Sequence, residues 1–306
     1  MLVVVALGGN ALPRRGEAPE AGTPLTNVRH AVAAIAEVAS GHRVVVTHGN
    51  GPQIGLLALQ SEANRDLRAY PLDILGAETE GMIGYMIEQE LGNTVPGRRV
   101  ASILTQVVVD VMDPAFRAPT KPIGPVYREA EARRLAAERG WHVAAAGDGW
   151  RRVVASPTPR AIVELAAIRI LLDAGALVVC AGGGGIPVVV DSHGARHGVE
   201  AVIDKDRSSA LLARGLGADA LLLLTDVPAV MRHWGTPDAH PIPSATADDL
   251  RSLQLDPGSM GPKASAAAWF AATTGGFAGI GAIDDASEII HGRAGTVVEA
   301  VVPEHV

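Results

Sequence analysis

The sequence predicts an α/β protein, built as a three-layer αβα sandwich around an open, mainly parallel sheet. Short runs of Val, Ile and Leu alternate with Ala-rich stretches of helical length over most of the 306 residues. The apolar runs lack a regular apolar–polar alternation, which is typical of strands buried on both faces of a parallel sheet. Strands and helices that alternate at this spacing form βαβ units, with helices on both faces of the sheet.

The expected strands are short runs rich in Val, Leu and Ile. In chain order they are Leu2–Leu7, Arg43–Thr47, Val100–Val109, Leu177–Cys180, Ala220–Thr225, Gly279–Ile283 and Thr296–Val302. The expected helices are longer stretches rich in Ala, Leu and Glu. In chain order they are Asn27–Val38, Gln53–Arg65, Gly76–Leu91, Glu129–Arg139, Pro159–Ala174, Lys205–Leu216 and Met260–Thr273.

One segment, residues 113–156, interrupts this alternation with many Pro, Gly and Arg residues. It holds a polar helix and two short strand candidates, around Trp141–Ala145 and Val153–Ala155. Linkers rarely contain Trp and runs of Val, so we expect a small subdomain that protrudes from the main sheet. Lys121, which has prolines close on both sides, is expected on a stiff loop of this subdomain.

Charge and cysteine content exclude several function classes. The formal net charge is −7 and no basic run is present, which argues against a nucleic-acid partner, because nucleic acids are bound by fields of Lys and Arg. A single cysteine, Cys180, rules out an internal disulfide framework and a Cys-rich zinc site. The amino terminus lacks a basic signal-peptide region, and Gly275 and Gly276 break the longest charge-free stretch, Ala264–Ile283. We therefore expect a cytoplasmic protein without a membrane span.

Glycine clusters follow several predicted strands, at the edge where open parallel sheets bind ligands. The clusters are Gly8, Gly9 and Asn10; Gly49, Asn50 and Gly51; and Gly182–Gly185. Without Cβ atoms, backbone N–H groups can surround an oxyanion, and the positive end of a helix adds to the attraction. The same glycines would also suit tight turns with positive φ, so the residues alone leave both interpretations open.

Lysine is rare in this chain. Only three of the 26 Lys and Arg residues are lysines, namely Lys121, Lys205 and Lys263. Because Arg is used almost everywhere else, the three lysines indicate positions where a guanidinium does not fit. A compact ammonium with three donors can lie among phosphate oxygens as a point charge. The alternative is that three ordinary surface lysines remain by chance.

Two aspartates accompany these motifs. Asp206 directly follows Lys205 and is expected to hold it in place, although an Asp at a helix start is also a common cap. Asp226 follows the apolar strand that ends at Thr225, where a carboxylate would reach ribose, magnesium or a lysine; a turn-forming Asp is the alternative. No Ser-His-Asp order or nucleophile elbow is present. The residues alone therefore favour phosphoryl transfer by positioning and charge neutralisation.

Eight motifs, in order along the chain, resemble those of carbamate kinases, a branch of the amino acid kinase superfamily. They are Leu7–Leu12, His48–Gly55, Gly81–Tyr85, Pro119–Tyr127, Gly149–Pro157, Ala181–Pro187, Gly198–Asp206 and Gly258–Lys263. Because they span nearly the whole chain, it is identified as a member of this branch. The resemblance implies a homodimer that transfers a phosphoryl group between Mg-ATP and carbamate, giving ADP and carbamoyl phosphate, often in arginine breakdown.

The resemblance also implies which parts of the chain bind each substrate. Residues 1–306 would form one kinase domain, with a carbamate- and phosphoryl-binding lobe over about 1–215 and a nucleotide-binding lobe over about 216–306. The two Gly-Asn loops would cradle carbamate and the transferring phosphoryl group, and the catalytic residues would be Lys121, Lys205, Asp206 and Lys263. The nucleotide would contact Lys205, Thr225, Asp226, Val227, Gly258, Ser259, Met260 and Lys263. The resemblance assigns no magnesium ligands to this chain.

Two alternatives remain open at this stage. A kinase of this type would also suit another small carboxylate or carbamate, and a weakly active relative would bind nucleotide in a regulatory role. Retention of all three lysines with Asp206 counts against the second. The chain departs from the family pattern at Glu80, where Gln is more usual, at Pro228, where an Asp is more usual, and in the stretch 231–243. Because proline removes a backbone donor, adenosine binding is expected to differ in detail.

Overall fold

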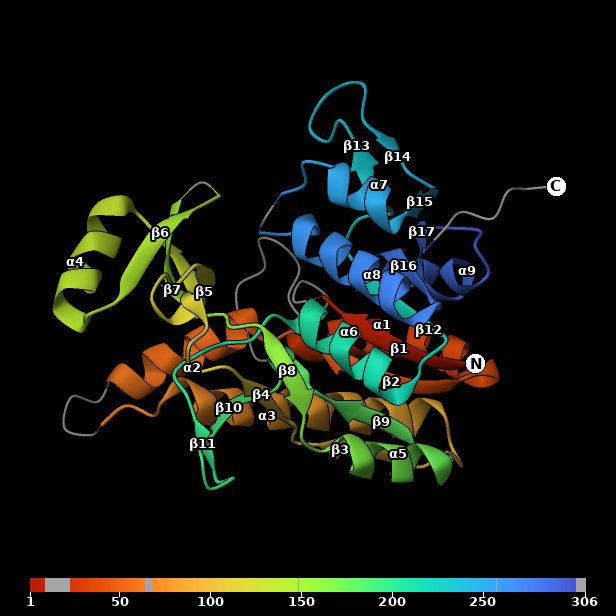
Figure 1. Ribbon diagram of the computed structural model, residues 1–306, viewed down its shortest axis with the longest axis horizontal. Helices are drawn as coiled ribbons and strands as arrows, with labels where there is room; N and C mark the ends of the chain where they lie inside the picture. The colour runs from red at the N-terminus through yellow and green to blue at the C-terminus, as the bar shows by residue number, and fades with distance from the viewer. Residues whose placement is uncertain (9–22, 64–67, 148, 257, 301–306) are drawn as a thin grey trace.

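The molecule is organised around an eight-stranded, mainly parallel sheet (Figure 1). The computed structural model describes residues 1–8, 23–63, 68–147, 149–256 and 258–300. The pair β16–β17 is antiparallel, and the other neighbouring pairs of this sheet are parallel, which confirms the predicted class. The strand order is β15 (Ser244–Thr246), β17 (Thr296–Glu299), β16 (Phe277–Ala282), β12 (Ala220–Thr225), β1 (Leu2–Leu7), β2 (Arg43–His48), β9 (Leu177–Cys180) and β3 (Val100–Ile103).

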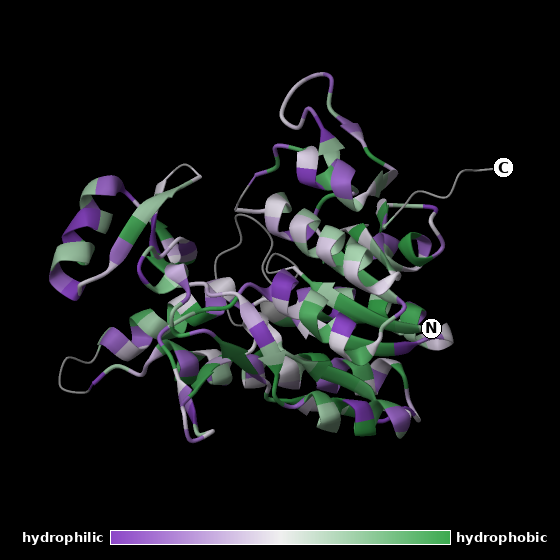
Figure 2. Ribbon diagram, in the orientation of Figure 1, coloured by the Kyte–Doolittle hydropathy of each residue, from purple (hydrophilic) through white to green (hydrophobic). Residues whose placement is uncertain are grey.

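Side chains of the central strands alternate between two cores, one on each face of the sheet. In β1, Val4 and Ala6 belong to one core, and Val3, Val5 and Leu7 belong to the other. The first core is covered by α5 (Leu165–Asp173), α6 (Lys205–Leu216) and α8 (Met260–Thr274). The second is covered by α1 (Thr23–Gly41), α3 (Leu72–Thr94) and α9 (Ala286–Ile290). The result is the predicted helix–sheet–helix sandwich, and Figure 2 shows its central strands as largely hydrophobic.

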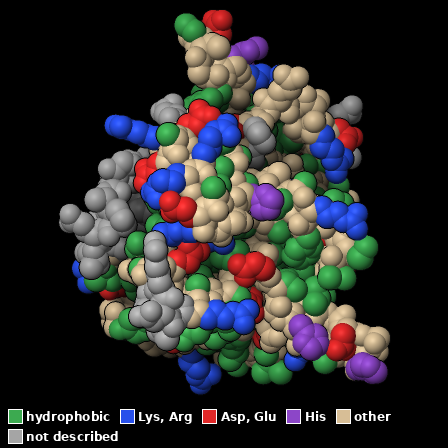
Figure 3. All heavy atoms as spheres, turned by 90° about the vertical axis from the view of Figure 1, so that its left-hand side faces the viewer, with side chains coloured by type: hydrophobic (Ala, Val, Ile, Leu, Met, Phe, Trp, Pro, Cys, Tyr) green, Lys and Arg blue, Asp and Glu red, His purple; other side chains and the backbone are tan. Residues whose placement is uncertain are grey.

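A separate three-stranded antiparallel sheet with one helix forms the protruding subdomain (Figure 1). Its elements are β5 (Lys121–Tyr127), α4 (Glu129–Arg139), β6 (His142–Ala146) and β7 (Gly149–Val154). The subdomain docks on α2 (Gly51–Ala63), where Gly55 faces Gly124 and Glu62 pairs with Arg139 and Arg152. Figure 3 shows Lys, Arg, Asp and Glu side chains interspersed at this end of the molecule.

Two expected elements are wrong in their extent, because strand pairing in the folded chain divides them. Val100–Val109 is two strands: β3 pairs with β9, whereas β4 (Gln106–Val109) pairs with β10 (Ile186–Val190) in a second, four-stranded sheet. The expected helix Pro159–Ala174 begins as β8 (Pro159–Ile162), which pairs with β4, and becomes helical only at α5. Thr105 and Gln106 interrupt the apolar residues of Val100–Val109 at the junction of β3 and β4, but the segment itself does not specify which strands its two halves pair with.

Lys121 lies at the start of β5 and not on a loop, so that expectation is wrong. Lys121 pairs with Val154 and Pro122 with Val153 of β7. A proline is compatible with a strand here because β5 is an edge strand, where a missing N–H breaks no ladder bond on its open side. The remaining strands and α-helices that the structure describes are β11 (Arg196–Gly198), α7 (Ala247–Ser252) and the hairpin of β13 (Met231–Arg232) and β14 (His240–Pro241).

The charge-free stretch Ala264–Ile283 is divided between α8 and β16, as expected for a helix followed by a strand. Among the described residues, no helix combines the length and the apolar character needed to cross a membrane.

Replacing Gly55 with Ala is expected to weaken the docking of the subdomain. A Cβ at this position would lie 2.0 Å from Cα and 2.1 Å from N of Gly124, so the two backbones would have to separate. Overpacking of this kind costs about 1–3 kcal/mol, to be measured as the free energy of unfolding in urea. The matched control is Gly92→Ala in α3, where a Cβ meets nothing within 4 Å. A Gly55→Ala variant as stable as the wild type would contradict the close approach.

Candidate active site

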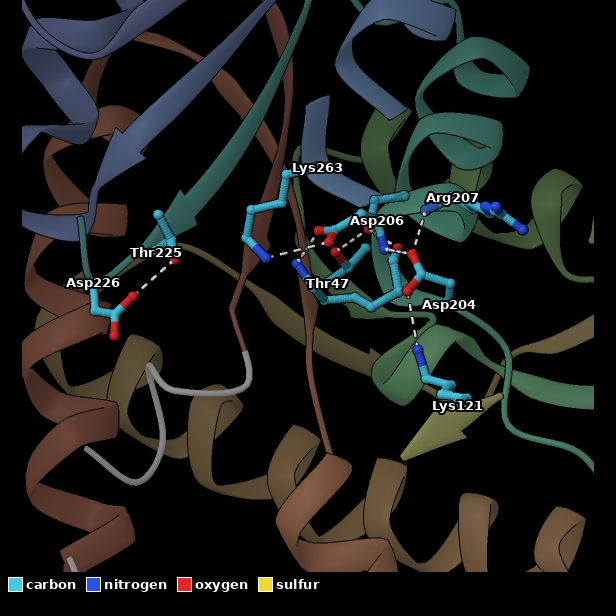
Figure 4. A network of polar contacts seen from close by, with 10 residues as sticks. Thr47, Lys121, Asp204, Asp206, Arg207, Thr225, Asp226 and Lys263 are labelled. Atoms are coloured by element: carbon cyan, nitrogen blue, oxygen red, sulfur yellow. Dashed lines mark hydrogen bonds and ion pairs between the residues drawn. The ribbon is translucent and has the colours of Figure 1, made fainter. Parts of the chain in front are cut away.

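Two lysines share one aspartate at the amino end of α6. Asp206 Oδ1 accepts a hydrogen bond from Lys205 Nζ at 2.6 Å, and Asp206 Oδ2 accepts one from Lys263 Nζ of α8 at 3.3 Å (Figure 4). The side chains of Lys205, Asp206 and Lys263 are 10%, 6% and 12% exposed. One carboxylate therefore holds two nearly buried ammonium groups.

Asp204 joins the third lysine to the same helix end. It is the N-cap of α6, and its Oδ1 accepts hydrogen bonds from the N–H groups of Asp206 and Arg207 at 3.0 and 3.2 Å. Its Oδ2 accepts a hydrogen bond from Lys121 Nζ at 3.0 Å. Burial alone would raise the pKa of Asp204, but the Lys121 ammonium and the hydrogen bonds lower it to about 2. The ionised carboxylate thus anchors Lys121 of the subdomain to α6.

The cluster carries more positive than negative charge. Burial lowers the pKa of Lys205, and the Asp206 carboxylate opposes this by stabilising the ammonium form. Because Lys205 and Lys263 share Asp206, one positive charge lacks a carboxylate of its own. The amino end of α6 adds partial positive charge. Buried charge is costly unless it is neutralised, so this arrangement favours binding of an anion such as a phosphate.

Three glycine-containing loops reach the same edge of the sheet. Gly8 follows β1, Gly49–Gly51 leads from β2 into α2, and Gly182–Gly184 follows β9 as a short 3-10 turn. The last loop is tied to α6, because Ser208 Oγ donates a hydrogen bond to the backbone oxygen of Gly184 at 2.7 Å. Gly9 and Asn10, also predicted to bind substrate, lie outside the described residues.

Asn50 lies directly against the third loop. A Cβ built on Gly183 would be 2.1 Å from Asn50 Nδ2 and 2.6 Å from Asn50 Oδ1. Only a glycine therefore lets the amide approach the backbone this closely. Asn50 is 4% exposed, so its amide belongs to the packed wall of the site and not to a surface turn.

The predicted nucleotide residues lie at the end of β12 and at the start of α8. Thr225 Oγ1 donates a hydrogen bond to Asp226 Oδ1 at 3.2 Å, and in the view of Figure 4 this pair lies on the opposite side of Lys263 from Asp206. Val227 follows this pair in an irregular segment. Gly258 and Ser259 precede Met260, the first residue of α8. The backbone N–H of Gly258 is held by the side chain of Asp256 at 2.9 Å.

Two buried titratable groups lie behind the loops. Burial lowers the pKa of His48, at the end of β2, to about 4, so its ring is neutral at pH 7. Glu80 of α3 is 2% exposed, and burial raises its pKa to about 8 although the N–H groups of Thr105 and Gly182 favour the ionised form. Glu80 therefore carries its proton at neutral pH.

No candidate metal centre emerges from the side chains. In the part of the chain that the structure describes, no group of three or more His, Cys, Asp and Glu residues is placed to hold a metal ion. His193 and His197, whose spacing resembles a metal-binding pair, are both exposed. His193 lies in a turn, and His197 lies in β11 and pairs with Asp191 at 2.9 Å.

The structure brings the four predicted catalytic residues into one network through Asp204. Asp204 was not among the predicted site residues, because its partner Lys121 lies 83 residues away in the chain. Glu80 was noted only as a departure from the family pattern and was not among the predicted site residues, since a single Glu inside a helical pattern gives no sign that it is buried. All three glycine loops had been singled out in the sequence, and the approach of Gly183 to Asn50 shows that the loop after β9 packs against the loop after β2.

Comparison with known proteins identifies close relatives over almost the whole chain. Residues 1–276 match the model of the amino acid kinase family. The chain is 53% identical to a carbamate kinase of Haemophilus influenzae, covering 97% of this chain and 96% of that protein. It is 47% identical to a carbamate kinase of Escherichia coli K12, covering 97% and 98%. Among solved structures, carbamate kinase from Giardia lamblia bound to AMP-PNP has a TM-score of 0.88 at 38% identity, covering 97% and 98%.

The free energy of unfolding is expected to depend on pH because the pKa of Glu80 is raised. Between about pH 4.5 and 8 the unfolded chain releases this proton while the folded chain keeps it, so folded-state stability falls as pH rises through this window. Above about pH 8 both states are ionised and the loss levels off. In Glu80→Gln this contribution is absent, so wild type should lose stability relative to the variant from pH 5 to 8 in urea unfolding. A constant difference between the two proteins across this range would show that the pKa of Glu80 is not raised.

Proposed function

The chain belongs to the amino acid kinase family, and we propose that it acts as a carbamate kinase. It transfers the terminal phosphoryl group of ATP to carbamate, giving ADP and carbamoyl phosphate, and it catalyses the reverse reaction. The observation that carries this proposal is the network in which Asp206 holds Lys205 and Lys263 while Asp204 holds Lys121. The relatives named carbamate kinase match the chain over nearly their full length, which supports carbamate over another acceptor or a regulatory role.

The network suits direct in-line transfer without a covalent enzyme intermediate. A carbamate oxygen attacks the γ-phosphorus, the bond from that phosphorus to the β,γ-bridging oxygen breaks, and the oxygen leaves with ADP. Lys205 and Lys263 neutralise the charge that develops on the phosphoryl and bridging oxygens, and Asp206 keeps both ammonium groups in place. Lys121 adds a third positive charge from the subdomain. Catalysis then consists of positioning and charge neutralisation.

The substrates would be divided between two lobes. In this proposal, Gly8, Gly9, Asn10 and the Gly49–Gly51 loop of the lobe formed by about residues 1–215 hold carbamate and the phosphoryl group. The nucleotide contacts Lys205, Lys263 and the segments 225–227 and 258–260, mostly in the lobe formed by about residues 216–306. The main sheet runs without interruption through both lobes, because β1 pairs with β12 across their boundary. That continuity would keep the two substrate sites in a fixed relation.

Magnesium would arrive with the nucleotide. Mg²⁺ in kinases is bound mainly by substrate phosphates and water, with only one or two carboxylates from the protein. The two aspartates of the network are already engaged by lysines, so the donor set fits an ion carried by ATP or ADP better than an ion bound by the protein alone. When bound, the ion would neutralise charge on the β- and γ-phosphates.

We also propose that the enzyme is a homodimer associated through the exposed face of α3. Ile74, Met82 and Tyr85 lie on one side of this helix and are 42–60% exposed, and Leu104 extends the same apolar surface beside Gly81. A gathering of exposed apolar side chains is typical of a protein–protein interface. The family resemblance supports a second copy as the partner. The same resemblance is the support for a cytoplasmic location and a place in arginine metabolism.

The dimer proposal is tested by the mass of the protein in solution. Light scattering is expected to give twice the chain mass of 31.5 kDa for the wild type. Met82→Lys places a charge in the apolar face, and burying an unpaired charge should weaken association by about 100-fold or more. Ile170→Lys, at a similarly exposed apolar position on α5, is the control and should remain dimeric. A wild type that stays at 31.5 kDa at micromolar concentration would contradict the proposal.

A single coupled assay tests the activity itself. Purified protein with ADP, Mg²⁺ and carbamoyl phosphate is expected to form ATP. Lys205→Ala removes a buried donor to the transferring group and should lower kcat by about 100-fold or more. Absence of ATP above the Lys205→Ala background would refute the carbamate kinase proposal. Binding of ADP without any turnover would instead indicate a nucleotide-binding protein with a regulatory role.

A further inference from the structure

The loop after β9 has a strained backbone. Ala181 has a φ of 50°, in the left-handed region that residues other than glycine rarely adopt. The three residues Gly183, Gly184 and Gly185 follow with φ values of 66°, 96° and 85°. Strain of this kind persists only where surrounding groups hold the backbone in place, and it concentrates at functional sites. The question is which side chains hold this loop.

Glu80 of α3 is the main anchor. Its Oε1 accepts a hydrogen bond from the backbone N–H of Gly182 at 2.9 Å, and its Oε2 accepts one from the N–H of Thr105 at 3.2 Å. Thr105 in turn uses its own Oγ1 to accept from the N–H of the strained Ala181 at 2.9 Å. Both N–H groups at the start of the loop are therefore fixed, directly or through Thr105, by one buried carboxyl group.

Thr79, the residue before Glu80, anchors the neighbouring loop. Its hydroxyl donates to the backbone oxygens of Leu75 and Gly76, each at 2.9 Å. Because the single hydroxyl proton is used there, Thr79 Oγ1 must accept the hydrogen bond from Asn50 Nδ2, also at 2.9 Å. The nitrogen end of the Asn50 amide therefore faces α3, and its oxygen end faces the opposite way.

The two anchored loops touch each other. The Asn50 amide covers the Cα of Gly183, and the ring of His48 lies where a Cβ of Gly182 would be, at 2.3 Å. The loop after β2 and the loop after β9 therefore form one packed unit, held from behind by two consecutive residues of α3. Thr79 and Glu80 are both buried, at 0% and 2% exposure, and neither lies among the residues proposed to contact substrate.

We propose that Thr79 and Glu80 are positioning residues, which hold Asn50 and the Gly182–Gly185 loop in the geometry that the carbamate end of the site requires. This inference rests on the proposed function for the identity of the ligand. Phosphoryl transfer by positioning tolerates little displacement, because a shift of about 1 Å can cost about 100-fold in rate. The two residues act through the backbone and Asn50, and the nucleotide lobe is not part of their network.

The first test distinguishes the effect of the Thr79 hydroxyl group from the effect of the side-chain volume. Thr79→Val keeps the volume and removes the hydrogen bond to Asn50, whereas Thr79→Ser keeps the hydroxyl. We expect Thr79→Val to lower kcat/KM for carbamoyl phosphate by about 10–100-fold. Thr79→Ser should stay within about threefold of the wild type, and the Kd for ADP, measured alone by calorimetry, should change less than about twofold in both variants. Equal kinetics in Thr79→Val and the wild type would overturn the assignment of Thr79.

The second test concerns Glu80 and does not depend on activity. Glu80→Leu removes both acceptors, so the N–H groups of Gly182 and Thr105 lose their partners. Hydrogen exchange in a peptide spanning residues 177–187 is expected to become at least about tenfold faster than in the wild type. The matched control is Glu90→Leu on the same helix, a buried Glu that pairs with Arg29 at 3.2 Å, and it should leave exchange in this peptide unchanged. If Glu80→Leu fails to fold, Glu80→Gln, which keeps one acceptor oxygen, is used with the same readout.

The outcomes distinguish failure of this inference from failure of the proposed function. Faster loop exchange together with a selective loss of kcat/KM for carbamoyl phosphate supports the positioning role. Unchanged loop exchange in a folded Glu80 variant overturns it, as does a loss of stability with normal kinetics. A wild type without carbamoyl phosphate:ADP phosphotransferase activity would refute the proposed function, and the exchange experiment would still decide whether Glu80 holds the loop.

Discussion

The site depends on one electrostatic constraint, namely that the Asp206 carboxylate lies between two nearly buried ammonium groups. Lys205 is the first residue of α6, and a cation is unfavourable there because the amino end of a helix is already positive. Burial adds a second penalty. Asp204 and Asp206 offset part of this, yet a positive surplus remains beside the helix end. A buried cation at the amino end of a helix lowers the stability of the fold. A residue of this kind is expected where anion binding, and not folding, favours it.

The parallel sheet explains how residues far apart in the chain meet at this point. β1, β2, β9 and β12 are neighbours or near neighbours, and their carboxyl ends lie at one edge. α6 follows a long excursion after β9, whereas Lys263 comes from α8 on the same face of the sheet. Lys121 is brought in by a separate subdomain and is fixed by Asp204. An anion that contacts all three lysines therefore takes its contacts from three independent segments, which is why their positions follow no regular spacing.

The residues of a segment were sufficient to predict the bounds of strands and helices whose ends are marked in the sequence. The prediction failed where pairing with a strand far away in the chain determines the bounds. The bounds of β1, β12 and α6 were predicted to the residue, because each of these elements is followed directly by a glycine or an aspartate. Val100–Val109 was predicted as one strand, but its two halves pair with β9 and β10, strands that the segment itself cannot specify. The same limit applies to the site. Rarity and motif context revealed the three lysines, whereas the burial of Glu80 follows only from the packing of α3 against the loops.

The glycines of the loop after β9 confirm the tight-turn interpretation and also permit close packing of neighbouring groups. Gly183 and Gly184 do adopt the positive φ that tight turns require. The absence of a Cβ serves a second purpose, since it admits the Asn50 amide at Gly183 and the backbone oxygen of Ile203 at Gly184. Ala181 adopts the same kind of φ without being a glycine. Its N–H donates a hydrogen bond to Thr105 Oγ1, and its backbone oxygen accepts one from the N–H of Gly184. The conformation of the loop therefore depends on Thr105, Glu80 and Asn50 as well as on the residues of the loop itself.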